Sequence, residues 1–469
     1  MELKFLQARS PEGINQLKQK LKHKKFSQQV VADFAECHRE TVGSMLKGRS
    51  VSSKIFKKVC EYLILDWTEI AQLETDIVPP ENPNTQPQIP DEFSEQIEEL
   101  IQSFCGREFV FEAIEQFFAQ KPKGYFTVVG EPGIGKSALA AKYVKDHQVI
   151  CYFNKLTNGR NRPEFFLDSI RAQLIHRYNL QGMEQAYLEP LLKRASQRLP
   201  SGERLIIVVD ALDEVEKRNP TENLLCLPES LPDGVYFLLT RRPYSLETKY
   251  LTVSIETQKD LDLSAQEYED FNQEDIKEYF WRGLRGELPK VDAVALERWV
   301  KARSLTPKEF VEYLAKKSEK NFMYGRHMLP AIARGEYNDL ELAKLPQGLK
   351  EYYKFHWIRK GMDKAAQEPK ATVLFILVAM GIPTSIKEMA EISGQEEVEV
   401  YRLFEREWYE YLTKQERGDK SSYSIYHTSY LNFLKGRTEL APHRDQFKAA
   451  NLKLANYHQE LTNYYLRGR

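Results

Sequence analysis

The chain has 469 residues, of which 42% are hydrophobic, 12% aromatic and 29% charged. These proportions are ordinary for folded globular proteins and exclude a disordered or fibrous chain. Lys and Arg number 67 against 68 Asp and Glu, so a strongly basic or acidic chain is excluded as well. A chain of this length exceeds one compact core, and about three or four domains are expected.

Charge is distributed unevenly along the chain. Residues 1–60 hold 13 Lys and Arg and 5 Asp and Glu, so this segment carries +8 and the remainder −9. Such asymmetry indicates a basic domain at the N-terminus. We find no apolar run near the roughly 20 residues that cross a bilayer, and the start lacks a signal-peptide pattern. A cytoplasmic protein without a membrane partner is therefore expected.

The first expected domain is helical throughout and covers residues 1–77. Apolar residues recur at helical spacing along this segment. Its middle part predicts a first helix from Ser27, a turn near Cys37 and a second helix from Arg39 to Leu46. This pair of helices around a tight turn is the pattern of a helix-turn-helix.

A proline-rich segment, residues 78–92, predicts an extended linker, because five prolines fall within VPPENPNTQPQIPD. Residues 93–265 then alternate between short apolar runs and helical stretches, which is typical of a buried parallel sheet. We therefore expect an α/β domain there. The expected strands are residues 125–129, 149–153, 204–210, 234–240 and 251–256.

Helical patterns dominate the rest of the chain. Residues 266–365 predict a helical lid domain behind the sheet. Residues 366–440 combine helices with a polar hairpin at 413–427, which are the parts of a winged helix. Residues 441–469 read as the start of a further helical segment.

The segment GEPGIGKS matches the P-loop pattern G-x-x-x-x-G-K-[ST] in full. It follows an expected strand and opens an expected helix, which is the context in which this motif cradles phosphates. Lys136 would reach the β- and γ-phosphate oxygens, and Ser137 would offer its hydroxyl to Mg²⁺. The expected nucleotide-binding residues of this loop are Gly130, Glu131, Pro132, Gly133, Ile134, Gly135, Lys136, Ser137 and Ala138.

Acidic residues follow the expected strand at 204–210, as a P-loop requires. Asp210 ends the strand and would hold Mg²⁺ together with Ser137. Asp213 or Glu214, just beyond it, would orient or deprotonate the attacking water. ATP or ADP with Mg²⁺ is thus the expected ligand.

Two arginines, Arg241 and Arg242, follow the strand expected at 234–240. An arginine at that strand tip can reach a γ-phosphate and report its presence. With these motifs in order, residues 93–469 resemble the STAND class of P-loop NTPases, the NACHT and AP-ATPase relatives that serve as signalling switches. The resemblance implies an ASCE-type core, and it aligns Arg242 with the arginine of the class.

Three further nucleotide contacts are implied by this resemblance alone. FCGRE is similar to a segment that lies against the adenine, which assigns Phe104, Gly106 and Arg107 to that role. LPQGLKEYY looks like a lid segment and assigns Pro346 to the nucleotide. YSIYHTSYLNFL is similar to a winged-helix motif whose histidine, here His427, touches the β-phosphate of bound ADP.

The N-terminal segment resembles helix-turn-helix modules that precede such ATPases in bacteria. This implies DNA contacts, and the residues expected to make them are Arg39, Glu40, Thr41, Lys47 and Arg49. A helical protein-interaction domain with a charged, solvated face is the alternative.

The resemblance implies a slow ATPase that works as a switch. It would hold ADP when inactive and self-associate after ATP binding, in defence or in signal-responsive regulation. An initiator- or transposition-type DNA-binding ATPase and a nucleotide-gated transcription regulator are the alternatives. An initiator would need a basic recognition helix in its winged helix, whereas IKEMAEISGQEEVEVYRLFERE is acidic.

Overall fold

The computed structural model describes residues 5–6, 17–18, 20–21, 28–35, 37, 39–46, 51–63, 65, 89–155, 160–215, 223–243, 251–364, 367–417, 420–438 and 443–467. The chain divides into two compact units, here named the N-terminal unit, Met1–Gln86, and the main unit, Pro87–Arg469. Among the helices of the described residues, none is long and apolar enough to span a bilayer.

The N-terminal unit has a small apolar core, to which Phe56, Val59 and Leu63 contribute from one face of a helix. Its two described strands pair antiparallel with each other. The expectation of an all-helical domain is therefore wrong, because two-residue strands are too short to leave an alternating pattern in the sequence. The described elements are β1 (Phe5–Leu6), α2 (Gln28–Phe34), α3 (Arg39–Met45), β2 (Val51–Ser52) and α4 (Ser53–Leu63).

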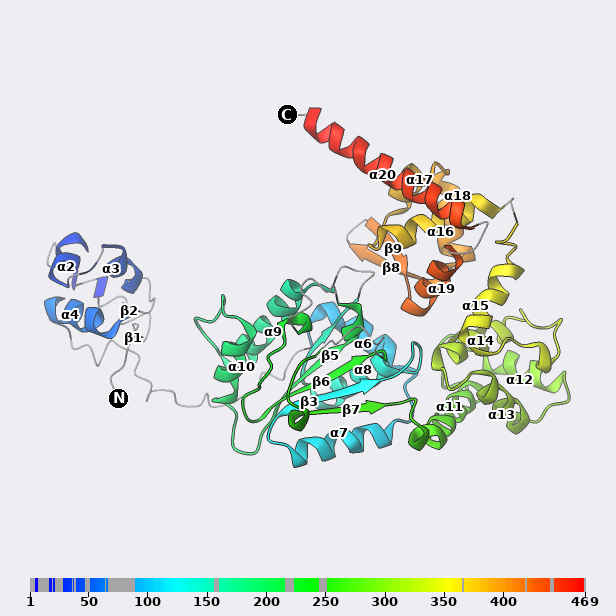
Figure 1. The fold of residues 1–469 in the computed structure, drawn as a ribbon, viewed down its shortest axis with the longest axis horizontal. Helices are drawn as coiled ribbons and strands as arrows, with labels where there is room; N and C mark the ends of the chain where they lie inside the picture. The colour runs from blue at the N-terminus through cyan, green and yellow to red at the C-terminus, as the bar shows by residue number, and fades with distance from the viewer. Residues whose placement is uncertain are drawn as a thin grey trace. The chain divides into compact units, whose positions relative to one another are not determined.

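The main unit contains a five-stranded parallel sheet with strand order β4-β5-β6-β3-β7 (Figure 1). The strand before the P-loop, β3, pairs with β6 up to Val129 and Arg241, so the end of β6 lies beside the start of the P-loop. This register places the expected phosphate and arginine motifs at one edge of the sheet. The strands are β3 (Gly124–Val129), β4 (Ile150–Phe153), β5 (Leu205–Asp210), β6 (Val235–Arg241) and β7 (Gln258–Asp262).

Helices bury the sheet. α7 packs against β3, α8 against β5 and β6, and α9 against β4. Every residue of β3, β4 and β6 is buried, as expected for parallel strands covered on both faces. The helix α6 starts inside the segment that we expected to be linker up to residue 92. These helices are α6 (Asp91–Ile101), α7 (Glu108–Gln120), α8 (Lys136–His147), α9 (Pro163–Tyr178) and α10 (Leu188–Ser196).

The strand expected at residues 251–256 is wrong, because the fifth strand of the sheet is β7, which begins at Gln258. β7 is an edge strand in which only Leu261 is buried, so its sequence is polar and lacks an apolar run. In the expected segment, Leu251 and Val253 pack against the sheet core from outside it, and Ile255 is exposed. The apolar residues of this segment therefore reflect packing against the sheet core and not pairing with a strand.

From Glu269 onward the main unit is helical, as expected. Local signals in the sequence set the helix starts. Thr306 and Glu309 form a capping box, and the side chains of Asp292 and Asn321 accept hydrogen bonds from backbone N–H groups of the helices that they precede. These helices are α11 (Glu269–Leu284), α12 (Ala293–Lys301), α13 (Pro307–Lys317), α14 (Phe322–Ala333) and α15 (Gly348–Arg359).

The C-terminal part of the main unit combines helices with one hairpin, β8–β9. A single antiparallel bridge joins Thr384 to Tyr423 of the hairpin. The last helix packs against α16 and α17, so the segment from residue 441 belongs to this part of the fold. The elements are α16 (Glu368–Met380), α17 (Ile386–Ser393), α18 (Glu397–Arg402), β8 (Leu412–Arg417), β9 (Lys420–Ile425), α19 (Thr428–Thr438) and α20 (His443–Arg467).

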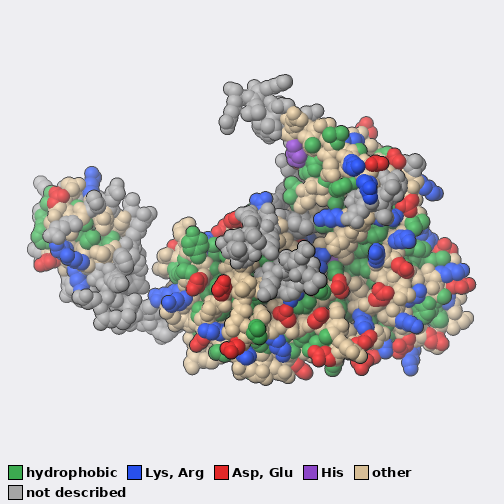
Figure 2. All heavy atoms as spheres, viewed as in Figure 1, with side chains coloured by type: hydrophobic (Ala, Val, Ile, Leu, Met, Phe, Trp, Pro, Cys, Tyr) green, Lys and Arg blue, Asp and Glu red, His purple; other side chains and the backbone are tan. Residues whose placement is uncertain are grey.

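The main unit has two apolar cores. One surrounds the sheet, and the other runs without interruption from α11 to α20. In this structure the segments expected to be a lid and a winged helix thus share one core. On the visible surface of the main unit, acidic and basic side chains are interspersed (Figure 2).

Polar contacts join the two parts that hold these cores, and one of them involves Gly106 and Arg107 in the loop before α7. Both residues have a positive φ, +71° and +75°. Asp275 of α11 lies against this loop, and the Arg107 N–H donates to Asp275 Oδ2 over 3.2 Å. A Cβ at Gly106 would lie 2.1 Å from Asp275 Oδ1, so only glycine fits there.

The substitution Gly106→Ala is expected to lower the free energy of unfolding by about 1–2 kcal/mol for the positive φ and by a further 1–3 kcal/mol for the clash, about 2–5 kcal/mol in all. Gly286→Ala is the matched control, because Gly286 has a φ of +75° but its Cβ would meet Ala293 at an ordinary 3.5 Å. Thermal and urea unfolding of both variants measures the difference. Equal losses would show that the Asp275 contact contributes nothing.

Candidate nucleotide site

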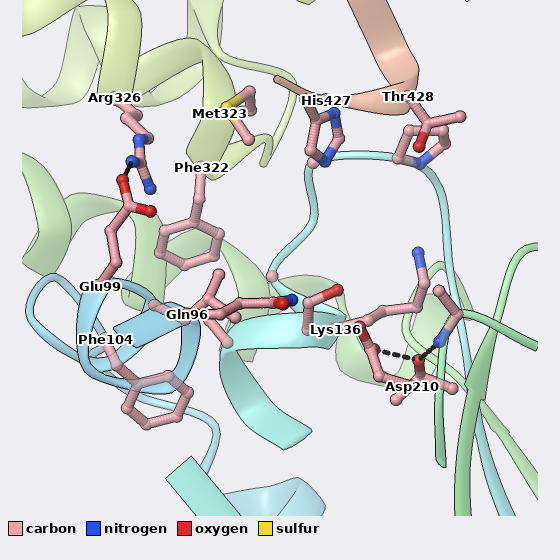
Figure 3. Close-up of a pocket in the computed structure, with 18 of the residues that line it drawn as sticks. Gln96, Glu99, Phe104, Lys136, Asp210, Phe322, Met323, Arg326, His427 and Thr428 are labelled. Atoms are coloured by element: carbon pink, nitrogen blue, oxygen red, sulfur yellow. Dashed lines mark hydrogen bonds and ion pairs between the residues drawn. The ribbon is translucent and has the colours of Figure 1, made fainter. Parts of the chain in front are cut away.

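A cavity of about 200 Å³ lies where the sheet, α14 and the segment after β9 meet (Figure 3). The P-loop, residues 130–135, connects β3 to α8 and forms one wall. In Figure 3, His427 and Thr428 face Lys136 and Asp210 across the cavity. The free N–H groups at the start of α8 open into it, and a helix N-terminus of this kind attracts phosphate.

Lys136 is the first residue of α8, and its ammonium group folds back over the P-loop. Lys136 Nζ donates to the carbonyl oxygens of Gly130 at 2.7 Å and Glu131 at 3.0 Å. Burial in the cavity lowers the pKa of Lys136 to about 8, although the carboxylates of Asp213 and Asp210 act against this shift. An anion beside Lys136 would raise this pKa again.

Asp210, the last residue of β5, is 2% exposed. Thr240 Oγ1 on β6 donates to Asp210 Oδ1 over 2.5 Å, and the Ser137 hydroxyl also bonds to this carboxylate. Burial raises the pKa of Asp210 to about 6. Hydroxyl and carboxylate oxygens, with phosphate oxygens and water, are the ligands that Mg²⁺ prefers, so Ser137 and Asp210 could hold this ion.

The two arginines after β6 point to different places. Arg241 is 3% exposed and bonds to Asp260 of β7 at 2.5 Å, outside the cavity lining. Arg242 lines the cavity, where its Nε lies 2.8 Å from Asp213 Oδ2 and its Nη2 lies 3.9 Å from Glu214 Oε1. Of the two, Arg242 is the one placed to meet a phosphate.

Arg107 lines the cavity and has 2% of its surface exposed. Its guanidinium donates to the P-loop carbonyl of Ile134 over 2.7 Å and to Asn272 on α11. It also pairs with Asp275 at 3.5 Å. Arg107 therefore braces the P-loop against the helical part.

Phe104 lies at the opposite end of the cavity from Asp210 (Figure 3).

The start of α14 rests on the P-loop. Asn321 Nδ2 donates to the Pro132 carbonyl over 2.8 Å, and Met323 N donates to that of Gly133 over 3.2 Å. One turn further along α14, Arg326 bonds to Glu99 of α6 at 2.7 Å. A movement of the helical part away from the sheet would break all three contacts.

His427 and Thr428 bring the C-terminal part into the cavity. Ser429 N–H donates to His427 Nδ1 over 3.1 Å, so the proton of the neutral ring is on Nε2. Burial, with Lys136 and Arg242 nearby, lowers the pKa of His427 to about 3. Thr428 Oγ1 donates to Glu214 Oε1, which connects the C-terminal part to the acidic residues after β5.

Most of the residues expected from the sequence meet at this cavity. Those that line it are Phe104, Arg107, Pro132, Gly133, Gly135, Lys136, Ser137, Ala138, Asp210, Asp213, Glu214, Arg242 and His427. Those outside the lining are Gly106, Gly130, Glu131, Ile134 and Pro346. Pro346 instead accepts a hydrogen bond from Tyr324 Oη through its carbonyl, which is a packing contact.

Several residues that the sequence analysis did not select also line the cavity. Asn154 follows β4 directly, and its position at the carboxyl edge of a parallel sheet was a usable signal. Thr428 follows His427. No sequence pattern marks Glu99 or Arg326, because their contact joins α6 to α14 across 227 residues.

The residues expected to contact DNA belong to the N-terminal unit, apart from this cavity. Arg39 starts α3 and is exposed, and Thr41 is half-buried. The Glu40 side chain, Lys47 and Arg49 lie outside the described residues. The helices expected from Ser27 and Arg39 correspond to α2 and α3.

Nucleotide affinity is expected to fall as the pH rises through about 8. In the free protein Lys136 loses its proton there, whereas a bound phosphate raises its pKa, so binding requires proton uptake above that pH. The dissociation constant of ADP should rise by up to about tenfold per pH unit above 8. Calorimetry from about pH 7 to 9.5 measures it, and Lys136→Met should lose the dependence.

Residues 125–287 match the NACHT domain model. No curated protein matches the chain significantly. Among solved structures, a signal transduction ATPase with numerous domains (STAND) and a tetratricopeptide repeat sensor from Pyrococcus horikoshii is 15% identical, with a TM-score of 0.37. That match covers 76% of this chain, which spans 45% of the length of the Pyrococcus protein.

A second solved structure is the RuvB Holliday junction branch migration motor of Thermotoga maritima. It is 13% identical with a TM-score of 0.22, and the match covers 74% of this chain and 97% of RuvB. The NACHT match includes β4 to β7, all of β3 except Gly124, the P-loop and Asp210, while α6, α7 and α12 to α20 lie outside it. Residues 125–287 are thus similar to the NACHT domain, an NTPase domain, and this similarity implies that the chain binds nucleotide.

Proposed function

We propose that the protein is a STAND-type switch in the cytoplasm that holds ADP in its inactive form and is activated by ATP. In this proposal residues 266–365 act as the lid and residues 366–440 as a winged helix. Hydrolysis is slow, because the free-energy difference between the two nucleotide states carries the signal and hydrolysis only resets it.

The observation that carries the proposal is the contact from Thr428 to Glu214. It joins the C-terminal part to an acidic residue that would act on the attacking water. Asp213 is the other residue that would act on this water, and its Oδ2 lies 2.8 Å from Arg242 Nε. Both carboxylates are thus held by contacts within the protein, which restricts how either could orient a water and supports an inactive form with slow ATP turnover.

Nucleotide state would be read through the same contacts. The Nε2–H of His427 is available to donate to the β-phosphate of ADP. Mg²⁺ would be held by Ser137 and Asp210. A γ-phosphate would add negative charge near Asp213 and Glu214 and compete with them for Arg242. This competition favours release of the C-terminal part and, we propose, self-association of the sheet domain.

The initiator alternative is disfavoured by α17 and α18, which carry an excess of acidic residues where a DNA-reading helix would be basic. DNA binding is proposed instead for the N-terminal unit, where Arg39 is exposed at the start of α3. A nucleotide-gated transcription regulator and a defence switch would differ in the partner that the N-terminal unit binds.

Purified protein is expected to carry ADP, which chromatography detects after denaturation. Thr428→Val removes the hydroxyl that donates to Glu214 while it keeps the side-chain shape. A hydrogen bond to a charged group contributes about 1.5–3 kcal/mol, so ADP release should become about 10–100-fold faster. Rapid mixing with a fluorescent ADP analogue measures the rate.

Thr372→Val is the matched control for this variant, because the Thr372 hydroxyl donates only to the Glu368 carbonyl within α16. Its ADP release should equal that of the wild type. An empty cavity together with rapid, untriggered ATP turnover by the wild-type protein would contradict the switch.

Arg39→Ala is expected to weaken DNA binding by about 1–3 kcal/mol and to lower the slope of affinity against salt by about one phosphate contact. Fluorescence anisotropy at several salt concentrations measures both. Lys448→Ala, at a 71% exposed lysine of α20, is the control and should change neither. Equal affinity of the Arg39 variant and wild type would favour the protein-interaction alternative.

A further inference from the structure

Asn154 is a buried amide at the edge of the cavity that no motif assigns. It follows β4, is 3% exposed and lines the cavity beside Asp210. Its side-chain oxygen, Oδ1, is buried and has no hydrogen-bond partner among the described residues. Of the six such side-chain atoms found there, it is the only one in the cavity lining.

Neighbouring groups determine which way this amide is turned. Asn154 Nδ2 donates to the main-chain oxygen of Asp210 over 2.7 Å, and Asn154 N donates to the same oxygen over 3.3 Å. A carbonyl oxygen can only accept, so the NH₂ group must face Asp210. Asn154 Oδ1 is then turned away from the main-chain oxygen of Asp210. An unpaired buried acceptor costs free energy, which indicates that a ligand or water completes it.

We propose that Asn154 Oδ1 accepts a hydrogen bond from the water that attacks the γ-phosphate. The inference rests on the proposed nucleotide site. Among the cavity-lining acceptors, Glu214 bonds to Thr428 and Asp213 to Arg242, whereas no described residue donates to Asn154 Oδ1. Asn154 and a released carboxylate would together orient both protons of the water.

The reaction that this arrangement serves is hydrolysis of ATP to ADP and phosphate. The water oxygen forms a bond to the γ-phosphorus, and the bond to the bridging oxygen breaks with its electron pair going to ADP. The water protons pass to the released phosphate or to Asp213 or Glu214. Asn154 takes no proton, and its part is to aim the water at phosphorus.

Asn154→Leu removes the acceptor, and Asn154→Asp keeps an oxygen in its place while it loses the NH₂ bond to Asp210. ADP alone is titrated into each variant, and the affinity for ADP plus fluoroaluminate is expressed relative to it, so that any change in ADP binding itself is removed from the comparison. With Asn154→Leu, ADP plus fluoroaluminate, which mimics the transferring phosphoryl group, should bind about 10–100-fold more weakly, and single-turnover hydrolysis should slow by about 100-fold. Asn154→Asp should lose less of this affinity and less of the hydrolysis rate than Asn154→Leu, although it should be the less stable variant.

Asn161→Leu, a buried asparagine outside the cavity lining, controls for the loss of a buried amide. The inference is overturned if Asn154→Leu binds ADP plus fluoroaluminate as tightly as wild type. It is equally overturned if the Asn154 variant with the lower melting temperature shows the larger losses of fluoroaluminate affinity and hydrolysis rate. Failure of the wild-type protein to bind ADP at all would instead refute the proposed nucleotide site.

Discussion

The buried guanidinium of Arg107 is the contact on which the geometry of the cavity depends. A charge that is 2% exposed is tolerated only where it is paired and hydrogen-bonded. Arg107 meets this condition with partners from both sides, the P-loop carbonyl of Ile134 and the side chains of Asn272 and Asp275 on α11. The P-loop is therefore held in place by the helical part as well as by the sheet.

The two parts joined in this way do not share an apolar core. The sheet has one core, and the helices from α11 to α20 have another. Polar contacts such as those of Asn321, Arg326 and Thr428 cross between them, together with ring contacts such as that of Phe109 with Phe271. Such an interface can separate while each core stays intact, because each net hydrogen bond contributes only about 0.5–1.5 kcal/mol.

A nucleotide in the cavity would add its own contacts across this interface, because residues from both parts line it. Lys136 and Asp210 come from the sheet domain, and His427 and Thr428 come from the C-terminal part. A ligand that touches both sides changes the free energy of separation by its differential affinity for the joined and separated forms. The cavity and the interface thus share residues from both parts, so in the proposed switch a bound phosphate would change how strongly the two parts are joined.

Much of the fold could be predicted from local patterns. The P-loop, Asp210 and four of the five strands follow from apolar runs and motif spacing, because buried parallel strands and phosphate loops depend on residues close in sequence. The strand β7 was misplaced because an edge strand needs few apolar residues. The pair β1–β2 was missed because two residues show no period.

What the sequence by itself determined is the ligand class, since Gly130 to Ser137 form a complete phosphate loop. Only the tertiary structure decided which residues act together. It paired Arg241 with Asp260 and Arg242 with Asp213, placed Thr428 on Glu214, and left the buried side-chain oxygen of Asn154 without a hydrogen-bond partner among the described residues. These pairings join residues far apart in the chain, and sequence spacing carries no information about the packing that brings them together.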